Sequence, residues 1–407
     1  MAGLLEGIRA VEFAARGVGP IAGLVLSQMG AEVIKIEDPA RGDPTRGYDT
    51  IGANLVSPGG HTIVFEFTNR DKKSVTIDLT KEKGREVVYR LIEKSDVFFS
   101  NYLPESLKRI NLDYETLSKH NPRLVYASSS SYGNKGPDRD KRAFDALGLA
   151  RSGLMMVSGE PGDPPTEIRG TIADCTAGTY LAWGIVGGLL ARERLGIGQE
   201  VDSSLFGPLI WMQQWNVAQY LVGVAGRARE FRNKMLTPLG NSYQCKDGRW
   251  IMVSTGSGGG RDSWPEFCRV MGLERLEKDP RFEEMKKRET NAEEFIRIMD
   301  SVFVNKTRDE WAAHFKAQNV SFLYERIQEV PELAADPQAL ANDYIVEEDH
   351  PLLGHIKSVR FPVHFSRLPM APVMKPAPRL GQHTDEVMLE LGYSRPEIAA
   401  LKKKKVV

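Results

Sequence analysis

Cysteine and net charge are both scarce in this chain of 407 residues. The three cysteines, Cys175, Cys245 and Cys268, lie far apart and form no C-x-x-C pair. Neither a disulfide framework nor a metal site is therefore expected. The 54 basic side chains balance 54 acidic ones, and this neutrality argues against a nucleic-acid partner, because such partners reward a basic excess. A small anionic ligand stays compatible with the composition if a few local cations hold it.

Long apolar runs are missing as well. The most apolar stretch, Ala177–Ala191, is shorter than the about 20 residues that cross a bilayer. The opening MAGLLEG is too short for a signal peptide, and no apolar segment follows it. We therefore expect a cytoplasmic protein with no membrane partner. An apolar fraction of 41% with 27% charged residues is that of a folded globular chain, and the length allows two or three domains.

The N-terminal half alternates between strand-like and helix-like segments. Strands are expected at Ile8–Phe13, Glu32–Glu37, Ser74–Leu79, Val97–Ser100, Arg123–Ser128 and Gln199–Leu205, and helices at Ile21–Met29, Glu82–Lys94 and Ala177–Arg194. This alternation predicts βαβ units and therefore an α/β fold with a parallel sheet. The segment Ala177–Arg194 is apolar on nearly every face, which predicts a helix that is buried all round.

The second half has a different pattern. Residues 206–232 resemble a long helical connector, and a strand–turn–strand unit is expected around Asp247-Gly248. Helices are expected at 263–271, 291–305 and 308–317. We therefore divide the chain into a first part (1–205), the connector (206–232), a small domain (233–325) and a last segment (326–407).

Two glycine-bearing segments are candidate functional sites. The first, Gly17–Ala22, fits G-x-G-x-x-A between a predicted strand and a predicted helix, and Glu37 closes the next strand. This spacing is typical of a dinucleotide site, in which glycines admit the pyrophosphate and an acid holds the ribose. A glycine-bearing turn of any α/β domain explains the same pattern, and short glycine patterns are common.

The second candidate, Gly170–Gly178, places Asp174 directly before the long apolar helix. One interpretation makes Asp174 the N-cap of that helix, a position where aspartate is favoured. The other makes it a nucleophile, because the helix dipole and amide donors would keep the carboxylate ionised while the glycines let a substrate approach. Local chemistry favours the cap.

A series of short motifs runs through nearly the whole chain. The most typical is Gly30–Glu37 (GAEVIKIE). The others are Leu5–Arg9, Gly19-Pro20, Lys72–Ser74, Asn121–Val125, Tyr132-Gly133, Gly136-Pro137, Asp174 with Ala177-Gly178, Gly196–Gln199, Lys246–Gly248 and Gly381–Asp385. In this order they resemble the class III CoA-transferases, the family of formyl-CoA:oxalate, carnitine and aryl-lactate CoA-transferases. Each motif is short, but the ordered set is highly specific.

This resemblance implies a Rossmann-like large domain that binds coenzyme A thioesters as substrates, with no permanently bound cofactor. The large domain would combine 1–205 with the last segment, and 233–325 would form a small α+β domain. Interlocked dimers are implied, either a homodimer or a heteromer with a paralogous subunit. Asp174 stands at the position of the family's nucleophilic aspartate. The implied reaction moves CoA from an acyl-CoA donor to a carboxylic acid through an aspartyl intermediate.

The resemblance also implies roles for further residues. Ile77, Asn101, Tyr102, Arg109 and Arg142 match the CoA contacts, Gly17, Val18, Tyr132 and Gly133 match positions near the substrates, and Gly258, Gly259 and Gly260 match a mobile glycine loop. The formyl-CoA:oxalate enzymes carry a glutamine where this chain has Gly17. The loss of that side chain argues against oxalate and favours a larger, partly apolar acid, such as a phenyllactate-like or benzylsuccinate-like compound.

Two alternatives stay open at this point. An α-methylacyl-CoA racemase would share these motifs, but racemases use a histidine–aspartate pair, and the chain has no histidine between His120 and His314. A non-catalytic CoA-binding subunit of a heteromeric CoA-transferase is the second alternative. The presence of Asp174 argues against it, although such a subunit could keep the residue.

Overall fold

The computed structural model describes residues 3–47, 62–224, 226, 228–235, 237–254, 263–368 and 375–407. The chain divides into two compact units. The larger comprises Met1–Met155, Glu167–Gly226 and Asn342–Val407, and the smaller comprises Met156–Thr166 and Arg227–Ala341. The first and last parts of the chain thus share one unit, whereas residues 326–341 belong to the smaller one.

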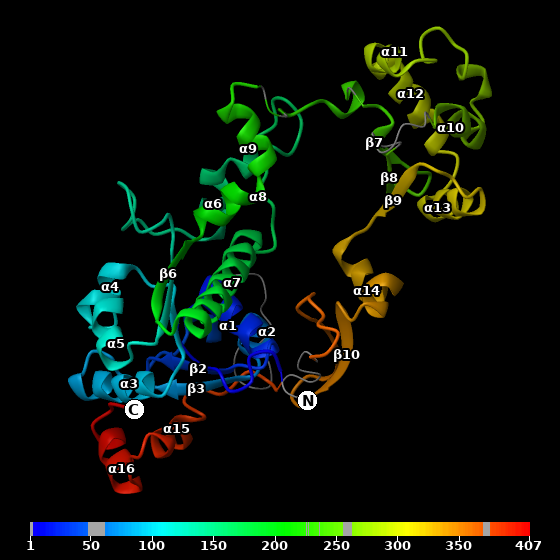
Figure 1. Cartoon of the computed structure of the whole chain (residues 1–407). Helices are drawn as coiled ribbons and strands as arrows, with labels where there is room; N and C mark the ends of the chain where they lie inside the picture. The colour runs from blue at the N-terminus through cyan, green and yellow to red at the C-terminus, as the bar shows by residue number, and fades with distance from the viewer. Residues whose placement is uncertain are drawn as a thin grey trace. The chain divides into compact units, whose positions relative to one another are not determined.

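A six-stranded sheet forms the centre of the larger unit (Figure 1). Its strands are β1 (Arg9–Phe13), β2 (Glu32–Glu37), β3 (Lys72–Thr76), β4 (Val97–Ser100), β5 (Val125–Ser130) and β6 (Gln199–Ser204). They lie in the order β3-β2-β1-β4-β5-β6, and every neighbouring pair is parallel. The α/β fold with a parallel sheet is therefore confirmed. Strand β3 begins two residues and ends three residues before the expected Ser74–Leu79, and β5 begins and ends two residues after the expected Arg123–Ser128.

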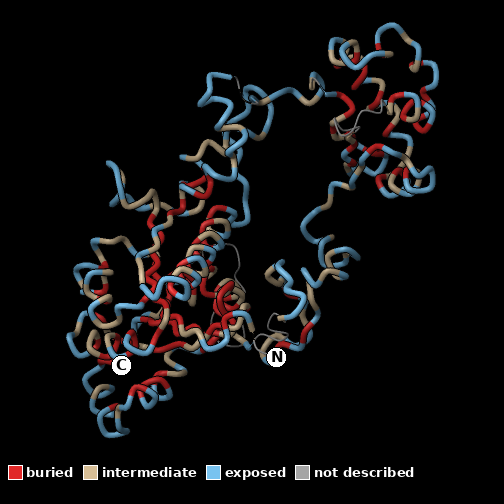
Figure 2. The backbone as a smooth tube through the Cα atoms, in the orientation of Figure 1, coloured by how far each residue is buried: buried red, intermediate tan, exposed pale blue. Residues whose placement is uncertain are grey.

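Helices cover both faces of this sheet. One face packs against α1 (Val18–Gln28) and α7 (Ile172–Leu195). The other packs against α3 (Glu82–Glu93), α4 (Pro104–Arg109), α5 (Tyr114–His120), α15 (Thr384–Glu390) and α16 (Arg395–Lys403). Figure 2 shows that the buried backbone of this unit follows the sheet and the inner sides of its helices. Burial on both faces favours apolar side chains on both sides of a strand, as in β4 (VFFS), although β1 and β2 also carry the buried charged residues Glu12 and Lys35.

The larger unit also contains α2 (Ile63–Asn69), α6 (Asp145–Ser152) and a hairpin of β10 (Ile345–His350) and β11 (Gly354–Val359). Two short helices, α8 (Phe206–Met212) and α9 (Gln214–Leu221), replace the expected continuous helix over 206–232. Gly223 adopts a left-handed backbone (φ 78°) just after α9. The turn that it makes ends the helical stretch, so the connector is helical only in its first half.

Helix α7 is not buried all round, contrary to the expectation from its sequence. Trp183 is 73% exposed and Leu195 is 68% exposed. The opposite side packs closely on the sheet, where a Cβ at Gly188 would lie 2.7 Å from Val125 Cγ1. An apolar helix can therefore rest on the sheet with one side only. Among the described helices, none is long and apolar enough to cross a membrane.

The smaller unit is built around a three-stranded antiparallel sheet. Its strands are β7 (Gly240–Gln244), β8 (Trp250–Ser254) and β9 (Leu323–Ile327), and its helices are α10 (Trp264–Met271), α11 (Met285–Thr290), α12 (Ala292–Phe303), α13 (Arg308–Ala317) and α14 (Pro337–Ala341). Aromatic side chains such as Trp264, Phe295 and Trp311 fill the core between them. The predicted strand–turn–strand unit is confirmed, with Gly248 in the left-handed region (φ 77°) at its turn.

Candidate active site

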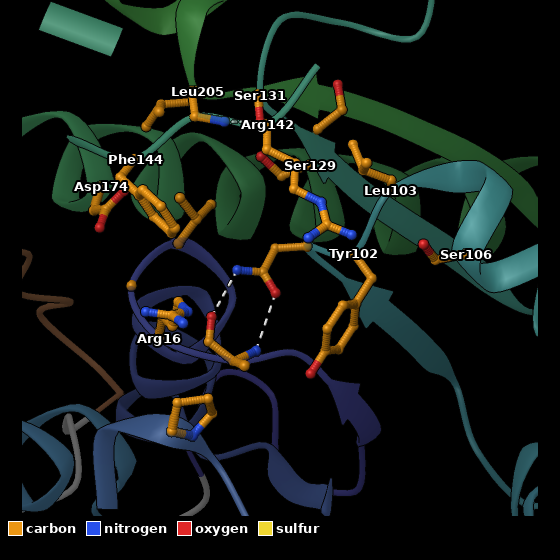
Figure 3. Close-up of a pocket in the computed structure, with 17 residues that line it drawn as sticks. Arg16, Tyr102, Leu103, Ser106, Ser129, Ser131, Arg142, Phe144, Asp174 and Leu205 are labelled. Atoms are coloured by element: carbon orange, nitrogen blue, oxygen red, sulfur yellow. Dashed lines mark hydrogen bonds between the residues drawn. The ribbon is translucent and has the colours of Figure 1, made fainter. Parts of the chain in front are cut away.

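A cavity of about 330 Å³ opens in the larger unit where the strands of the parallel sheet end (Figure 3). It is lined by Ala15, Arg16, Gly17, Val18, Pro44, Asn101, Tyr102, Leu103, Ser106, Ser129, Ser130, Ser131, Arg142, Ala143, Phe144, Asp174 and Leu205. Most of these residues lie in or just after β1, β4, β5 and β6, whereas Pro44 follows β2 and Asp174 lies in α7. The chain order reverses between β1 and β4, and such a switch point is the usual ligand-binding crevice of an open parallel sheet.

Asp174 lies in this cavity as the third residue of α7, not as its cap. The N-cap is Thr171, whose backbone is left-handed (φ 55°) and whose side chain makes no capping hydrogen bond. The backbone N–H of Asp174 donates a hydrogen bond of 3.0 Å to Oδ1 of Asp145. Among the described residues, none donates a hydrogen bond to the Asp174 carboxylate. The capping interpretation is therefore wrong, and both carboxylate oxygens are left for other chemistry.

The Asp174 carboxyl is also harder to ionise than an ordinary aspartate. Burial, followed by the negative charge of Asp145, raises the pKa of Asp174 to about 6. The pKa of Asp174 therefore lies above its ordinary value, although the residue is in the first turn of α7. A carboxylate with a pKa close to neutrality is more basic and more nucleophilic than one with an ordinary pKa, while it is still largely ionised at pH 7.

Gly17 lies directly against this carboxylate. A Cβ at Gly17 would stand 2.1 Å from Oδ2 of Asp174, closer than any side chain can approach. Gly178 has a similar role one turn further along α7, because a Cβ there would lie 2.7 Å from the backbone oxygen of Val18. Glycines at both positions let α7 and the start of α1 approach closely, which brings Asp174, Gly17 and Val18 to one wall of the cavity.

Glu37 does not have the role that a dinucleotide site would give it. Its carboxylate accepts hydrogen bonds from Arg46 (2.7 and 2.8 Å) and from the hydroxyl of Ser74 (2.6 Å), and its side chain is 1% exposed. The Arg46 guanidinium and the other partners outweigh burial and lower its pKa. No ribose can reach this acid, so the dinucleotide interpretation of the first glycine motif is wrong.

Buried charged side chains fix the position of the loop Ala14–Val18. Lys35 is fully buried, pairs with Glu12 (2.7 Å) and Asp43 (2.9 Å), and donates to the backbone oxygen of Ala14 (2.9 Å). The three acids around Lys35 raise its pKa despite burial. Asp43 in turn accepts from the backbone N–H of Arg16 at 3.3 Å. This network fixes one side of the cavity.

Arg16 has a left-handed backbone with φ 72°. Such a conformation costs an arginine about 1–2 kcal/mol and persists only where surrounding contacts enforce it. The side-chain amide of Asn101 supplies one of these contacts, since it accepts from the N–H of Ala15 (3.0 Å) and donates to its carbonyl oxygen (2.8 Å). The Arg16 guanidinium lies 5.1 Å from the centre of the Phe144 ring.

Three of the expected CoA-binding residues, Asn101, Tyr102 and Arg142, line the cavity. Figure 3 draws Arg142 with its guanidinium extended towards Tyr102. A neighbouring hollow of about 390 Å³ shares Tyr102 and Ser106 with the cavity and is also lined by Arg109. Ile77 is placed elsewhere: it is 1% exposed and belongs to the apolar core on the far face of the sheet.

Tyr132 and Gly133 lie outside the lining of the cavity. Tyr132 packs under the guanidinium of Arg151 (4.4 Å), and the N–H of Gly133 donates to Ser130 Oγ (2.9 Å). Gly258, Gly259 and Gly260 lie outside the described residues. Within the described chain, no group of three or more histidine, cysteine, aspartate or glutamate side chains is arranged to hold a metal ion.

Sequence reasoning missed several lining residues, above all Arg16, Phe144 and Ser129. Ser129 is 3% exposed, and its hydroxyl has no hydrogen-bond partner among the described residues. The serine run after Tyr126 was a usable signal, because polar residues at the carboxyl end of a buried parallel strand face the ligand crevice. Arg16 gave no such signal, since its backbone conformation depends on contacts with Asp43 and Asn101, which follow β2 and β4.

The fold and the cavity define an α/β enzyme whose site lies at the switch point of a parallel sheet. The family model of CoA-transferase family III matches residues 5–384, and the chain belongs to this family. It is therefore a CoA-transferase, an enzyme that moves CoA between an acyl-CoA and a carboxylic acid.

Individual relatives agree with this assignment. The chain is 32% identical to the (R)-2-hydroxy-4-methylpentanoate CoA-transferase of Clostridioides difficile, with 99% of each chain covered. It is 31% identical to the cinnamoyl-CoA:phenyllactate CoA-transferase of Clostridium sporogenes, with 99% of this chain and 97% of that one covered. The crystal structure of a CAIB/BAIF family protein from Brucella suis matches with a TM-score of 0.84 and 28% identity, covering 96% of this chain and 100% of that one.

Proposed function

We propose that Asp174 is the nucleophile of the CoA transfer. A carboxylate oxygen of Asp174 attacks the thioester carbonyl of the donor, the C–S bond breaks, and CoA leaves as a thiolate, which yields a mixed anhydride. The thiolate then attacks the aspartyl carbonyl, and the donor acid leaves as a carboxylate. The acceptor carboxylate repeats these steps in reverse on the aspartyl-CoA thioester. The transfer of CoA from one acid to the other is thus divided into covalent steps, each with a lower barrier than a direct exchange.

The observation that carries this proposal is the state of the Asp174 carboxyl. It lines the cavity, lies against Gly17, receives no hydrogen bond from a described residue and has a pKa raised to about 6. A structural carboxylate would be paired or hydrogen-bonded instead, as Glu37 is. Ser129 also lines the cavity, and its hydroxyl, which has no hydrogen-bond partner among the described residues, is a candidate donor for the oxygen that becomes negative when the thioester is attacked.

Coenzyme A would extend from Asp174 past Tyr102 towards Arg109. Arg142 and Arg109 supply the cations that its phosphates require, and arginine suits phosphate because its guanidinium donates two parallel hydrogen bonds. Within the described chain Arg142 forms no salt bridge, so its charge is available to a ligand. The neutral composition is compatible with this arrangement, because only a few placed cations are needed.

The acceptor is proposed to be a partly apolar acid, of the phenyllactate-like or benzylsuccinate-like class. Phe144 is 58% exposed where it lines the cavity, and Val18 and Leu205 add apolar walls. Gly17 leaves no polar side chain beside the nucleophile to orient a small acid such as oxalate. The name of the phenyllactate enzyme from Clostridium sporogenes supports the same class.

A homodimer is proposed as the working form, as interlocked dimers are implied for this family. The protomer exposes Trp183 on α7 and Trp215 on α9, which are 73% and 82% exposed. Apolar aromatic side chains of this size are typical of interface cores. Sedimentation analysis checks the proposal: a monomer at micromolar concentration would contradict it.

The test of the nucleophile is chemical trapping with hydroxylamine. Incubation with an acyl-CoA and hydroxylamine should convert the side chain of Asp174 into a hydroxamate, which peptide mass spectrometry detects. Asp174→Ala and Asp174→Asn should lose both the modification and the transfer of CoA. Full transferase activity of either variant would refute the mechanism. Exchange of the α-proton of an acyl-CoA without any acceptor acid would favour the racemase alternative, for which the cavity lining offers no histidine.

A further inference from the structure

We propose that Asp145, the first residue of α6, is a positioning residue for the nucleophile. Its carboxylate caps helix α7 from outside that helix and holds the backbone of Asp174, and its negative charge acts on the carboxyl of the same residue. This inference rests on the proposed role of Asp174 and adds to it a residue that does not line the cavity.

Helix α7 begins without a cap of its own. The hydroxyl of its N-cap residue Thr171 donates to the backbone oxygen of Gly170 (2.7 Å) and makes no capping hydrogen bond. The first N–H groups of a helix need partners from outside it. For the N–H of Asp174 that partner is Oδ1 of Asp145, at 3.0 Å. Figure 3 shows Phe144, the residue before Asp145, beside Asp174.

The capping contact falls on the nucleophile itself. Asp145 holds the N–H of Asp174, and Gly17 stands on the side of its carboxylate, where a Cβ would lie 2.1 Å from Oδ2. The helix that carries Asp145 is also fixed to α7, because Leu149 of α6 and Ala173 of α7 belong to one buried core cluster. A shift of Asp145 would therefore move the backbone from which the reacting carboxyl extends.

The charge of Asp145 adds a second effect. Arg16 and Arg142 also line the cavity, whereas α1, α8 and the rest of the first turn of α7 carry no charged side chain. Within the described chain Asp145 forms no ion pair, and after burial it is the second cause that raises the pKa of Asp174 to about 6. Burial also raises the pKa of the adjacent Cys175 thiol, which keeps it neutral.

Repulsion between the two carboxylates disfavours the resting enzyme more than the covalent intermediates. Asp145 and Asp174 are both negative when the site is free, but the anhydride and the thioester leave no charge on Asp174. The repulsion is relieved when Asp174 attacks the thioester. A residue outside the cavity thus favours the covalent step without touching either substrate.

The experiment measures the release of donor acid in the first turnover against pH for Asp145→Asn and Asp145→Ala. Asparagine keeps an oxygen for the N–H of Asp174 but has no charge, so the midpoint should move to lower pH by about half a unit or more. Its rate at pH 8 should stay within about threefold of the wild type, because the backbone contact remains. Asp145→Ala should lower that rate by about 10- to 100-fold and leave KM for the acyl-CoA unchanged.

The matched controls are Asp140→Asn and Asp140→Ala. Asp140 precedes the same helix but pairs with Arg139 (3.2 Å) outside the cavity lining, so both variants should keep the rate and the midpoint. An unchanged midpoint in Asp145→Asn would overturn the inference, and so would a fully active Asp145→Ala. If Asp145→Ala does not fold, the midpoint of Asp145→Asn decides alone.

Hydroxylamine trapping separates the failure of this inference from failure of the proposed nucleophile. Asp145→Asn should still form the Asp174 hydroxamate from acyl-CoA at pH 8. Trapping in the wild type together with an unchanged midpoint in Asp145→Asn would contradict only the role of Asp145. Absence of trapping in the wild type would instead contradict the role of Asp174.

Discussion

Gly17 and Asp174 touch: a Cβ on Gly17 would stand 2.1 Å from the carboxylate oxygen Oδ2 of Asp174. Residues far apart in the sequence thus meet at one wall of the cavity, and neither can change without affecting the other. With the carboxylate in this place, no larger residue fits.

The first prediction concerns this contact. Gly17→Ala should lower kcat by about 100-fold, because the added methyl group displaces the Asp174 carboxylate by about an ångström. Steady-state kinetics with a saturating acyl-CoA measure the effect. The matched control is Gly187→Ala in α7, where nothing lies within 4 Å of the added Cβ; this variant should keep full activity. A fully active Gly17→Ala enzyme would show that the contact does not position the nucleophile.

The pH dependence of the donor step follows from the pKa of Asp174. Only the ionised carboxylate attacks the thioester, and its pKa is raised to about 6. The rate of donor-acid release in the first turnover should therefore rise with pH, reach half its maximum near pH 6 and be constant above about pH 7.5. Rapid-quench measurements between pH 4.5 and 8 test this profile. A rate that does not change over that range would mean that the attacking carboxyl has an ordinary pKa.

The same pKa predicts the stability of Asp174→Asn. A carboxyl whose pKa is higher in the folded state than in the unfolded state favours folding below the unfolded value near 3.8 and loses this contribution as the pH rises through about 6. The neutral amide avoids this loss. At pH 8 the variant should be more stable than the wild type by about 1–2 kcal/mol, which allows for residual solvation, and the advantage should vanish near pH 4. Urea unfolding at the two pH values measures the difference; equal stability at pH 8 would contradict the raised pKa.

The buried network below the loop gives a prediction about stability. Lys35→Met leaves the Glu12 and Asp43 carboxylates without their shared cation, and breaking such a buried pair should destabilise the protein by about 3–5 kcal/mol. Lys83→Met removes an exposed pair with Glu86 (2.7 Å) and should leave the stability nearly unchanged, because solvent screens such a pair. Urea unfolding compares the two variants. A mild effect of Lys35→Met would mean that the loop does not depend on this charge.

The proposed path of coenzyme A is tested at Arg142. Arg142→Gln should raise KM for the acyl-CoA donor by about 10-fold, equivalent to one lost charge-assisted contact, and leave KM for the acceptor acid unchanged. Arg139→Gln, whose side chain pairs with Asp140 outside the cavity lining, serves as the control. An unchanged KM for the donor would place the phosphates elsewhere.

The parallel sheet could be predicted from the sequence because burial on both faces leaves a clear local pattern in each strand. Strand β2 coincides with the expected segment Glu32–Glu37. Helix α7 shows the limit of this reasoning. Its sequence is apolar on nearly every side, so it does not indicate which side packs against the sheet. The exposure of Trp183 is determined by tertiary packing alone.

The site was predictable where a single residue type is required. Asp174 and Gly17 were both singled out from local patterns and are in contact. Arg16 was not singled out, because its left-handed backbone and its direction depend on Asp43 and Asn101, which are distant in sequence. Ile77 shows the opposite error: an apolar residue near the end of a strand was assigned to the ligand, but it belongs to the core.

The most direct test of the account is the release of donor acid in the absence of an acceptor. Mixing the enzyme with excess acyl-CoA should release one equivalent of the donor acid per active site in a burst, and peptide mapping should find CoA attached through a thioester to Asp174. Asp174→Asn should give neither the burst nor the adduct. Donor acid released only after the acceptor is added, with no covalent CoA on the protein, would contradict the aspartyl mechanism.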